Sequence, residues 1–190
     1  MKLRPTSAES KLVERSEILD AVGMARVLRR IAFEIVERVG HDAYFVGIHT
    51  GGAILAERMV KLLVEGGEKR PDLGAVDITL YRDDVFKGLP KPEIGPTDLK
   101  QSIDDRTVVL VDDVLFTGRT VRAAMDVLVD YGRPRAVQLA VLVDRGRREL
   151  PIQPDYVGVR QQTTAEQSVH ITFSEHGELD RAVLLERNGK

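Results

Sequence analysis

Short aliphatic runs alternate with amphipathic segments along the chain, and this pattern predicts alternating strands and helices. Apolar residues at helical spacing from Leu28 to Val39 predict a helix that begins near Ser16 or Asp20 and ends at Gly40. Further helices are predicted at 53–66 and from Val121 to Gly132. Continuous apolar runs predict strands at 43–48, 74–81, 107–111, 136–143 and 155–159, and 168–173 with 181–186 predict a final hairpin or extra strands.

This order of elements predicts an α/β fold, with a doubly wound, mostly parallel sheet flanked by helices. No linker divides residues 1–190, so we expect a single domain. Residues 1–16 are polar and are expected to form a loosely ordered leader. The long polar stretch 82–106 is expected to be a flexible lid, because loops of that length are uncommon unless they are functional. Ligands of such sheets bind beyond the carboxyl ends of the strands, so the segments that follow the strands are the candidate site.

Composition narrows the class of protein. The 190 residues contain 28 Lys and Arg against 30 Asp and Glu, and a net charge of −2 indicates no general attraction to nucleic acid. There is no cysteine, which excludes disulfides and thiolate chemistry. No apolar run approaches the roughly 20 residues of a membrane span, and the charged N-terminus lacks the apolar region of a signal peptide. We therefore expect a cytoplasmic protein without a membrane partner. The four histidines have no metal-ligand spacing and are interpreted as ordinary surface or structural residues.

The stretch "VVLVDDVLFTGRT", residues 108–120, places Asp112 and Asp113 directly after an aliphatic run. Thr117 to Thr120 then open a helix, whose free N–H groups and partial positive charge suit a phosphate. Carboxylates repel phosphate, so the two aspartates should face ribose hydroxyls or a metal ion. The pattern favours a sugar 5′-phosphate with Mg²⁺ over a simple strand end with a solvated aspartate.

A second anionic region is predicted near Thr50, Gly51 and Gly52, which follow the first predicted strand of the sheet. Glycine there frees backbone N–H groups to approach an anion. Arg82 adds a cation beside the predicted lid, and Arg145 adds another near the last strands.

These segments resemble the phosphoribosyl pyrophosphate (PRPP) motif of type I phosphoribosyltransferases. The match extends through "DITLYRDD" (77–84), residues 111–146 and "RELPI" (148–152), and there it resembles the bifunctional pyr operon attenuation regulator and uracil phosphoribosyltransferase family. It runs from about Glu17 to Val159. The resemblance implies the type I fold with a small hood from the terminal segments, a homodimer or higher homo-oligomer, and formation of UMP and diphosphate from uracil and PRPP with Mg²⁺.

The resemblance also implies a role for each matched residue. Asp112 and Asp113 would hold the ribose hydroxyls and lie near Mg²⁺, and with Arg82 they would form the catalytic group. Uracil would be recognised near Arg145, Val157 and Val159. The PRPP and nucleotide site would consist of Thr50, Gly51, Gly52, Asp112, Asp113, Val114, Leu115, Phe116, Thr117, Gly118, Arg119 and Thr120.

Regulation by binding the pyr mRNA leader, with UMP or UTP as effector, would need a basic surface. The candidate residues are Arg26, Arg29, Arg30, Arg147, Arg148 and Arg160. Several positions depart from the family pattern: Gly51 replaces an arginine of the pyrophosphate loop, and Phe33, Gln153 and Val159 replace polar or basic residues. A salvage transferase that has lost RNA regulation is therefore the alternative. A purine phosphoribosyltransferase is disfavoured by "DITLYRDD" and "DRGRRELP". A response regulator is disfavoured because its aspartate pair would follow the first strand.

Overall fold

The structure is a computed structural model, and it describes residues 12–79, 97–178 and 180–188. Its core is a parallel sheet in the order β3-β2-β4-β5-β6. The five strands are β2 (Tyr44–Ile48), β3 (Asp72–Val76), β4 (Thr107–Leu115), β5 (Ala136–Asp144) and β6 (Tyr156–Arg160). The predicted doubly wound α/β fold is thereby confirmed.

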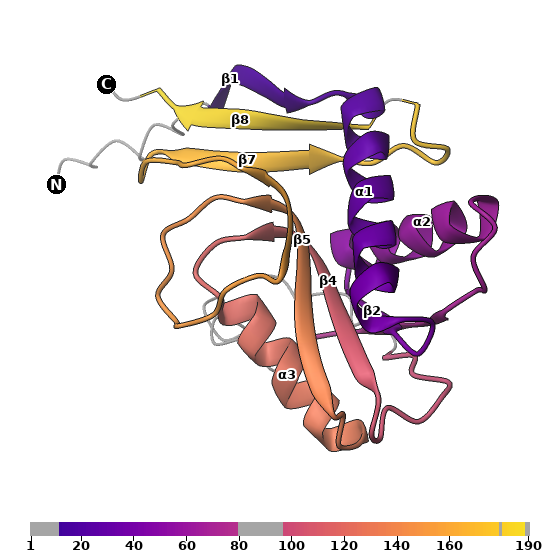
Figure 1. Ribbon diagram of the computed structural model, residues 1–190. Helices are drawn as coiled ribbons and strands as arrows, with labels where there is room; N and C mark the ends of the chain where they lie inside the picture. Colours follow the sequence, from indigo (N-terminus) through magenta and orange to yellow (C-terminus); the bar gives the residue numbers. More distant parts are fainter. Residues whose placement is uncertain (1–11, 80–96, 179, 189–190) are drawn as a thin grey trace, which may run out of the picture.

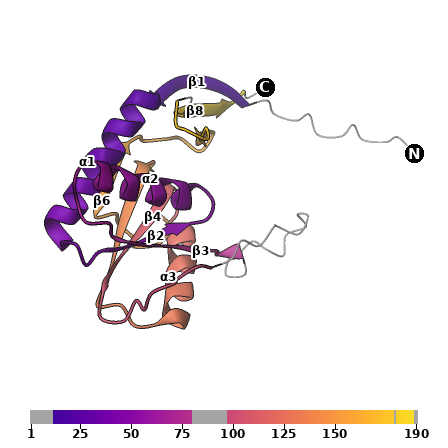
Figure 2. The ribbon, with the colours of Figure 1, turned by 90° about the vertical axis from the view of Figure 1, so that its right-hand side faces the viewer.

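Helices cover both faces of this sheet (Figure 2). α1 (Ala21–Val39) and α2 (Gly51–Glu65) pack on one face, and α3 (Arg119–Tyr131) packs on the other. β4 serves both layers because successive side chains point to opposite faces. Val109 and Val111 join the core under α1 and α2, whereas Val108 and Leu110 join the core under α3. The aliphatic run of β4 is therefore continuous rather than alternating.

A second, antiparallel sheet in the order β1-β8-β7 forms the hood, with strands β1 (Leu12–Leu19), β7 (Gln167–Thr172) and β8 (Arg181–Arg187). Figure 1 shows β7 lying across the carboxyl ends of the central strands. The predicted hairpin of the last two strands is confirmed. The prediction of a leader over 1–16 is wrong for residues 12–16, which pair with β8, and residues 1–11 lie outside the described part.

Two element boundaries differ from prediction in ways that concern the site. β3 ends at Val76 rather than at residue 81, and β4 continues through both aspartates to Leu115 because it keeps pairing with β5.

None of the helices within the described residues combines the length and hydropathy that a bilayer span requires.

The described end of the predicted lid, residues 97–106, packs on the sheet. Asp98 exchanges two backbone hydrogen bonds with Ala75 on the outer edge of β3, at 3.0 and 2.8 Å, and Ile103 is buried. These contacts place 97–106 in the body of the domain, so we restrict the lid prediction to the residues before Thr97. Residues 80–96 lie outside the described part of the chain.

Candidate functional site

The end of β4 meets the start of α2 at the carboxyl edge of the sheet. β2 pairs with β4 only as far as Val111, so Asp112 and Asp113 extend beyond it. The start of α2 fills this place so closely that side chains are excluded. A Cβ on Gly52 would lie 2.1 Å from the carbonyl oxygen of Val111, and one on Gly51 would lie 2.2 Å from Oδ2 of Asp113. The two glycines thus bring the Asp113 carboxylate against the Thr50–Gly52 loop.

The two carboxyl groups lie beside each other, that of Asp112 buried and that of Asp113 half-buried. Asp112 is 6% exposed, and its Oδ1 accepts a hydrogen bond from the Asp113 N–H at 2.9 Å. Burial raises the pKa of Asp112 well above its ordinary value, and the charge of Asp113 raises it further. Burial also raises the pKa of Asp113, against the opposing effects of the Val114 N–H, 2.7 Å from Asp113 Oδ1, and of the charge of His170. In the described part of the chain Asp112 has no ion-pair partner, so the pair can accept a cation or hydroxyl donors.

A phosphate cradle follows this pair at the start of α3. Gly118 precedes the helix with a φ of 93°, a left-handed conformation that favours glycine. The Thr117 carbonyl accepts hydrogen bonds from the N–H groups of Glu149 and Leu150, at 3.0 and 3.1 Å, which fixes the turn. Neither α2 nor α3 has an acidic residue in its first turn. Two positive helix ends therefore flank the aspartates, as two separate anionic groups on one ligand would require.

The loop after β5 contains two arginines that serve the fold. Arg148 donates from Nε to the Ile152 carbonyl at 3.0 Å, from Nη1 to the Phe116 carbonyl at 3.0 Å, and from Nη2 to Asp144 Oδ1 at 2.7 Å. Its side chain is only 13% exposed. Sequence reasoning placed Arg148 on the RNA surface, but its guanidinium is occupied inside the protein, so we remove it from that set.

Arg145 is likewise buried, and burial lowers its pKa. It lies against the Phe116 ring and donates hydrogen bonds to the hood segment, so it supports the pocket instead of presenting a free edge to uracil. Of the two valines predicted near uracil, Val157 is the second residue of β6, away from the carboxyl edge, and its carbonyl accepts a hydrogen bond from Arg30 at 2.8 Å. Val159 lies opposite Val143 near the carboxyl edge, where a base could be reached.

The remaining RNA candidates lie at the surface. Arg26, Arg29 and Arg30 are exposed on α1, and Arg147 and Arg160 are exposed at the carboxyl edge. Arg30 also binds the carbonyls of Val157 and Gly158, so only part of its donors is available. Arg82, the predicted catalytic cation, lies outside the described residues.

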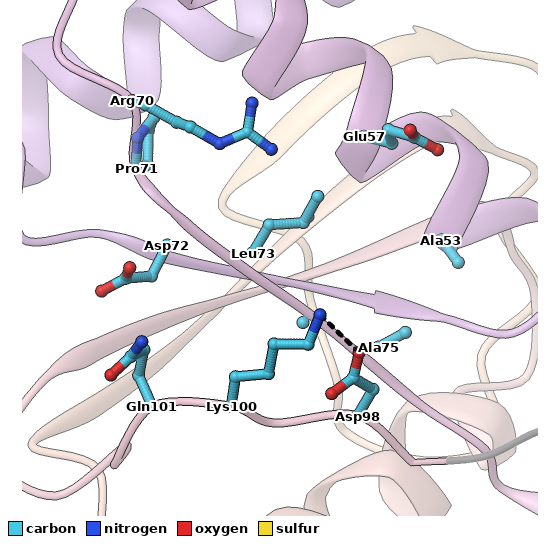
Figure 3. Close-up of a pocket in the computed structure, with 11 residues that line it drawn as sticks. Ala53, Glu57, Arg70, Pro71, Asp72, Leu73, Ala75, Asp98, Lys100 and Gln101 are labelled. Atoms are coloured by element: carbon cyan, nitrogen blue, oxygen red, sulfur yellow. Dashed lines mark ion pairs between the residues drawn. The ribbon is translucent and has the colours of Figure 1, made fainter.

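A separate hollow lies on the outer edge of β3, and Figure 3 shows its lining. Its volume is about 420 Å³, and it contains Arg70 and Lys100 together with Glu57, Asp72 and Asp98. Lys100 is 3.4 Å from Asp98, and Arg106 pairs with Asp72 beside the hollow. With three carboxylates against two cations it does not suit a phosphate. Among the described residues that line it there is no member of the predicted site.

Two further residues contribute to the site. Asp144 is 8% exposed at the end of β5 and anchors Arg148, and like Asp112 it directly follows an aliphatic run. His170 was interpreted as an ordinary residue. It lies on β7, whose position over the sheet depends on long-range pairing that no local pattern shows.

Comparisons with known proteins agree with this geometry. Residues 14–175 match the phosphoribosyl transferase domain. A bifunctional protein PyrR of a Thermoanaerobacter species is 47% identical over 175 residues, covering 91% of this chain and 98% of that protein. A protein of the same name from Geobacter sulfurreducens is 52% identical over 165 residues, with 85% and 93% covered. The hypoxanthine phosphoribosyltransferase of Trypanosoma cruzi superimposes with a TM-score of 0.66 over 92% of this chain and 98% of its own, and at 14% identity it shows the fold alone.

Proposed function

The chain belongs to the bifunctional PyrR family of phosphoribosyltransferases, and on that premise we propose that it forms UMP and diphosphate from uracil and PRPP and regulates pyr expression by binding mRNA. The observation that carries the transferase proposal is the pair of the buried Asp112 and the half-buried Asp113 between two helix N-termini. Solved structures of two hypoxanthine phosphoribosyltransferases superimpose on the chain, but at 19% and 14% identity they show the fold alone and do not bear on the choice of base.

In the proposed reaction N1 of uracil loses its proton and bonds to C1 of the ribose while the bond from C1 to pyrophosphate breaks, and the proton leaves with the diphosphate or to water. The start of α3, from Thr117 to Thr120, binds the 5′-phosphate through backbone N–H groups. Asp112 and Asp113 accept hydrogen bonds from the ribose hydroxyls, and the Thr50–Gly52 loop binds the leaving pyrophosphate. The protein need not form a covalent intermediate, because positioning of the reactants and stabilisation of the charge that develops in the transition state accelerate the reaction.

The carboxylates of Asp112 and Asp113 suit Mg²⁺ only when a bound ligand supplies further oxygen atoms to the ion. Within the described residues no three His, Cys, Asp or Glu side chains gather closely enough to hold a metal on their own. Two carboxylates with phosphate oxygens and water are the surroundings that Mg²⁺ prefers. Asp112 and Asp113 would hold the ion together with PRPP, and it would neutralise charge on the departing pyrophosphate.

Regulation requires an RNA surface apart from this pocket. We propose Arg26 and Arg29 on α1 with Arg147 and Arg160 at the carboxyl edge, and Arg30 with its remaining donors. A homodimer would bring two such surfaces together. Because the protein has a net charge of −2, RNA affinity must come from these local cations and should fall steeply with salt. An effector nucleotide can regulate only if RNA binds one nucleotide state more tightly than the other.

Paired assays on one preparation test both halves of the proposal. UMP formation is measured from PRPP, uracil and Mg²⁺, and binding to the leader RNA of the organism's pyrimidine genes is measured with and without UMP over a range of salt concentrations. Asp113→Asn should reduce UMP formation while leaving RNA binding without nucleotide nearly intact. Arg26→Glu should reduce RNA binding while leaving UMP formation nearly intact. RNA binding that is absent or insensitive to UMP at low salt would leave the salvage enzyme alone. Absence of UMP formation would refute the transferase.

A further inference from the structure

Arg145 joins three separate segments around the pocket. It lies at the carboxyl end of β5 and is 9% exposed. Its Nε donates to Thr163 Oγ1 at 3.1 Å and its Nη2 donates to the Gln167 carbonyl at 2.6 Å. The guanidinium carbon lies 3.9 Å from the centre of the Phe116 ring, within the range of a cation–π contact. Phe116 belongs to the turn that leads to the phosphate cradle, whereas Thr163 and Gln167 lead into the hood.

These segments form the two halves of the nucleotide pocket. One half, residues 112–120, carries the aspartates and the phosphate cradle. The other half, residues 159–172, runs from the end of β6 through β7 and covers the carboxyl edge where the base would lie (Figure 1). The Arg145 backbone reinforces the junction, because its N–H donates to the Leu115 carbonyl at 3.1 Å.

We propose that Arg145 is a positioning residue: it fixes the hood segment relative to the residue 112–120 turn, and recognition of UMP depends on that fixed spacing. The inference rests on the proposed nucleotide site and assigns Arg145 a role through Phe116, Thr163 and Gln167 rather than through contact with uracil. A ligand that touches both halves binds more tightly when their spacing is already fixed, because otherwise part of the binding free energy is used to order the two halves. A ligand that touches only one half gains nothing.

The inference is tested by comparing two ligands on one variant. UMP spans both halves, whereas ribose 5-phosphate reaches only residues 112–120. In Arg145→Gln we expect the Kd of UMP to rise about tenfold, the effect of losing one hydrogen bond to a charged group. The Kd of ribose 5-phosphate should change by less than about twofold. Calorimetry measures both, and Arg133→Gln, an exposed arginine beyond the opposite end of β5, is the matched control.

The outcomes separate a positioning role from general damage. Equal weakening of both ligands, or no weakening, overturns the inference. Arg145→Lys keeps the charge but not the fork of donors or the flat face, so it should behave like the Gln variant, and restored UMP affinity would also overturn the inference. If Arg145→Gln does not fold, Thr163→Val removes one acceptor and should raise the UMP Kd about threefold with the same selectivity. If wild type binds neither ligand, the proposed site itself is wrong.

Discussion

Asp112→Asn should weaken the binding of ligand and at the same time stabilise the ligand-free protein. The carboxamide has the shape of the carboxyl group and keeps the Oδ1 acceptor that the Asp113 N–H contacts at 2.9 Å. It lacks the charge that ribose hydroxyls and Mg²⁺ require. The loss of a charged hydrogen bond should cost about 1–3 kcal/mol of binding, roughly a five- to 150-fold rise in the Kd of UMP.

The stability effect has the opposite sign, because the Asp112 carboxylate is buried at 6% exposure beside another carboxylate. Folding raises the pKa of Asp112, so the folded protein retains a proton that the unfolded chain releases above the ordinary value of 3.8. Wild-type stability therefore falls as the pH rises from that value through the folded pKa, and remains lower above it. A charged group buried without a partner costs about 1–3 kcal/mol, so Asp112→Asn should raise the Tm by about 2–10 °C at pH 7.5.

Thermal unfolding of the ligand-free protein between pH 4 and pH 8 measures this gain, which should be small at pH 4. Asp144→Asn is the matched control, because Asp144 is also buried at the carboxyl edge but accepts a hydrogen bond from Arg148 at 2.7 Å. Its neutralisation leaves the guanidinium unpaired and should destabilise by about 3 kcal/mol. A destabilised Asp112→Asn, or a gain that does not change with pH, would refute the electrostatic reasoning.

Three further outcomes follow from contacts in the structure. Gly51→Arg should weaken UMP binding in calorimetry, because a Cβ at residue 51 would lie 2.2 Å from Asp113 Oδ2 and displace that carboxylate; unchanged affinity would show that Asp113 moves freely. Arg26→Glu should reduce the salt dependence of RNA binding by about one counterion, and an unaltered slope in filter binding would exclude this residue from the interface. Asp180→Ala should lower the free energy of unfolding by about 3 kcal/mol in denaturant unfolding, because Arg58, 20% exposed, loses its ion pair to the hood. A loss below about 0.5 kcal/mol would contradict a stabilising role of this ion pair.

Local hydrophobic patterns predicted the central sheet and its helices, because the buried residues of these elements recur at the spacing of a helix or form a continuous apolar strand. The stripe from Leu28 to Val39 gave α1, and the run ending at Val111 gave β4. β1 was missed because its strand conformation depends on pairing with β8, and five of its eight residues, from Leu12 to Leu19, are exposed. Such a segment has little hydrophobic pattern to read, so only the tertiary partner reveals it.

The parts of the site that lie within one short stretch of sequence were predictable, whereas the parts that depend on contacts between distant segments were not. The Asp112 and Asp113 pair and the Gly118 turn lie within one short stretch, so their spacing was informative. The burial of Arg148 was not, because it depends on how its own loop folds back and on the Phe116 carbonyl, which lies 32 residues away in the chain. The place of Phe33, one of the departures from the family pattern, was not predictable either: it is half-buried and packs so closely on the end of α2 that a Cβ on Gly66 would lie 2.4 Å from its ring.

The hydrogen bonds that Arg30 donates to the carbonyls of Val157 and Gly158, at 2.8 and 3.0 Å, have a consequence for the behaviour of the protein in a crowded cell. β6 is the last strand of the central sheet, and an open strand edge is a template on which other chains can add and aggregate. Arg30 occupies acceptors that an incoming strand would need. At the opposite edge Asp98 occupies the donor and acceptor of Ala75 in the same way. Part of each margin of the central sheet is thus blocked against intermolecular strand pairing, at β6 by the Arg30 side chain and at β3 by the backbone of Asp98.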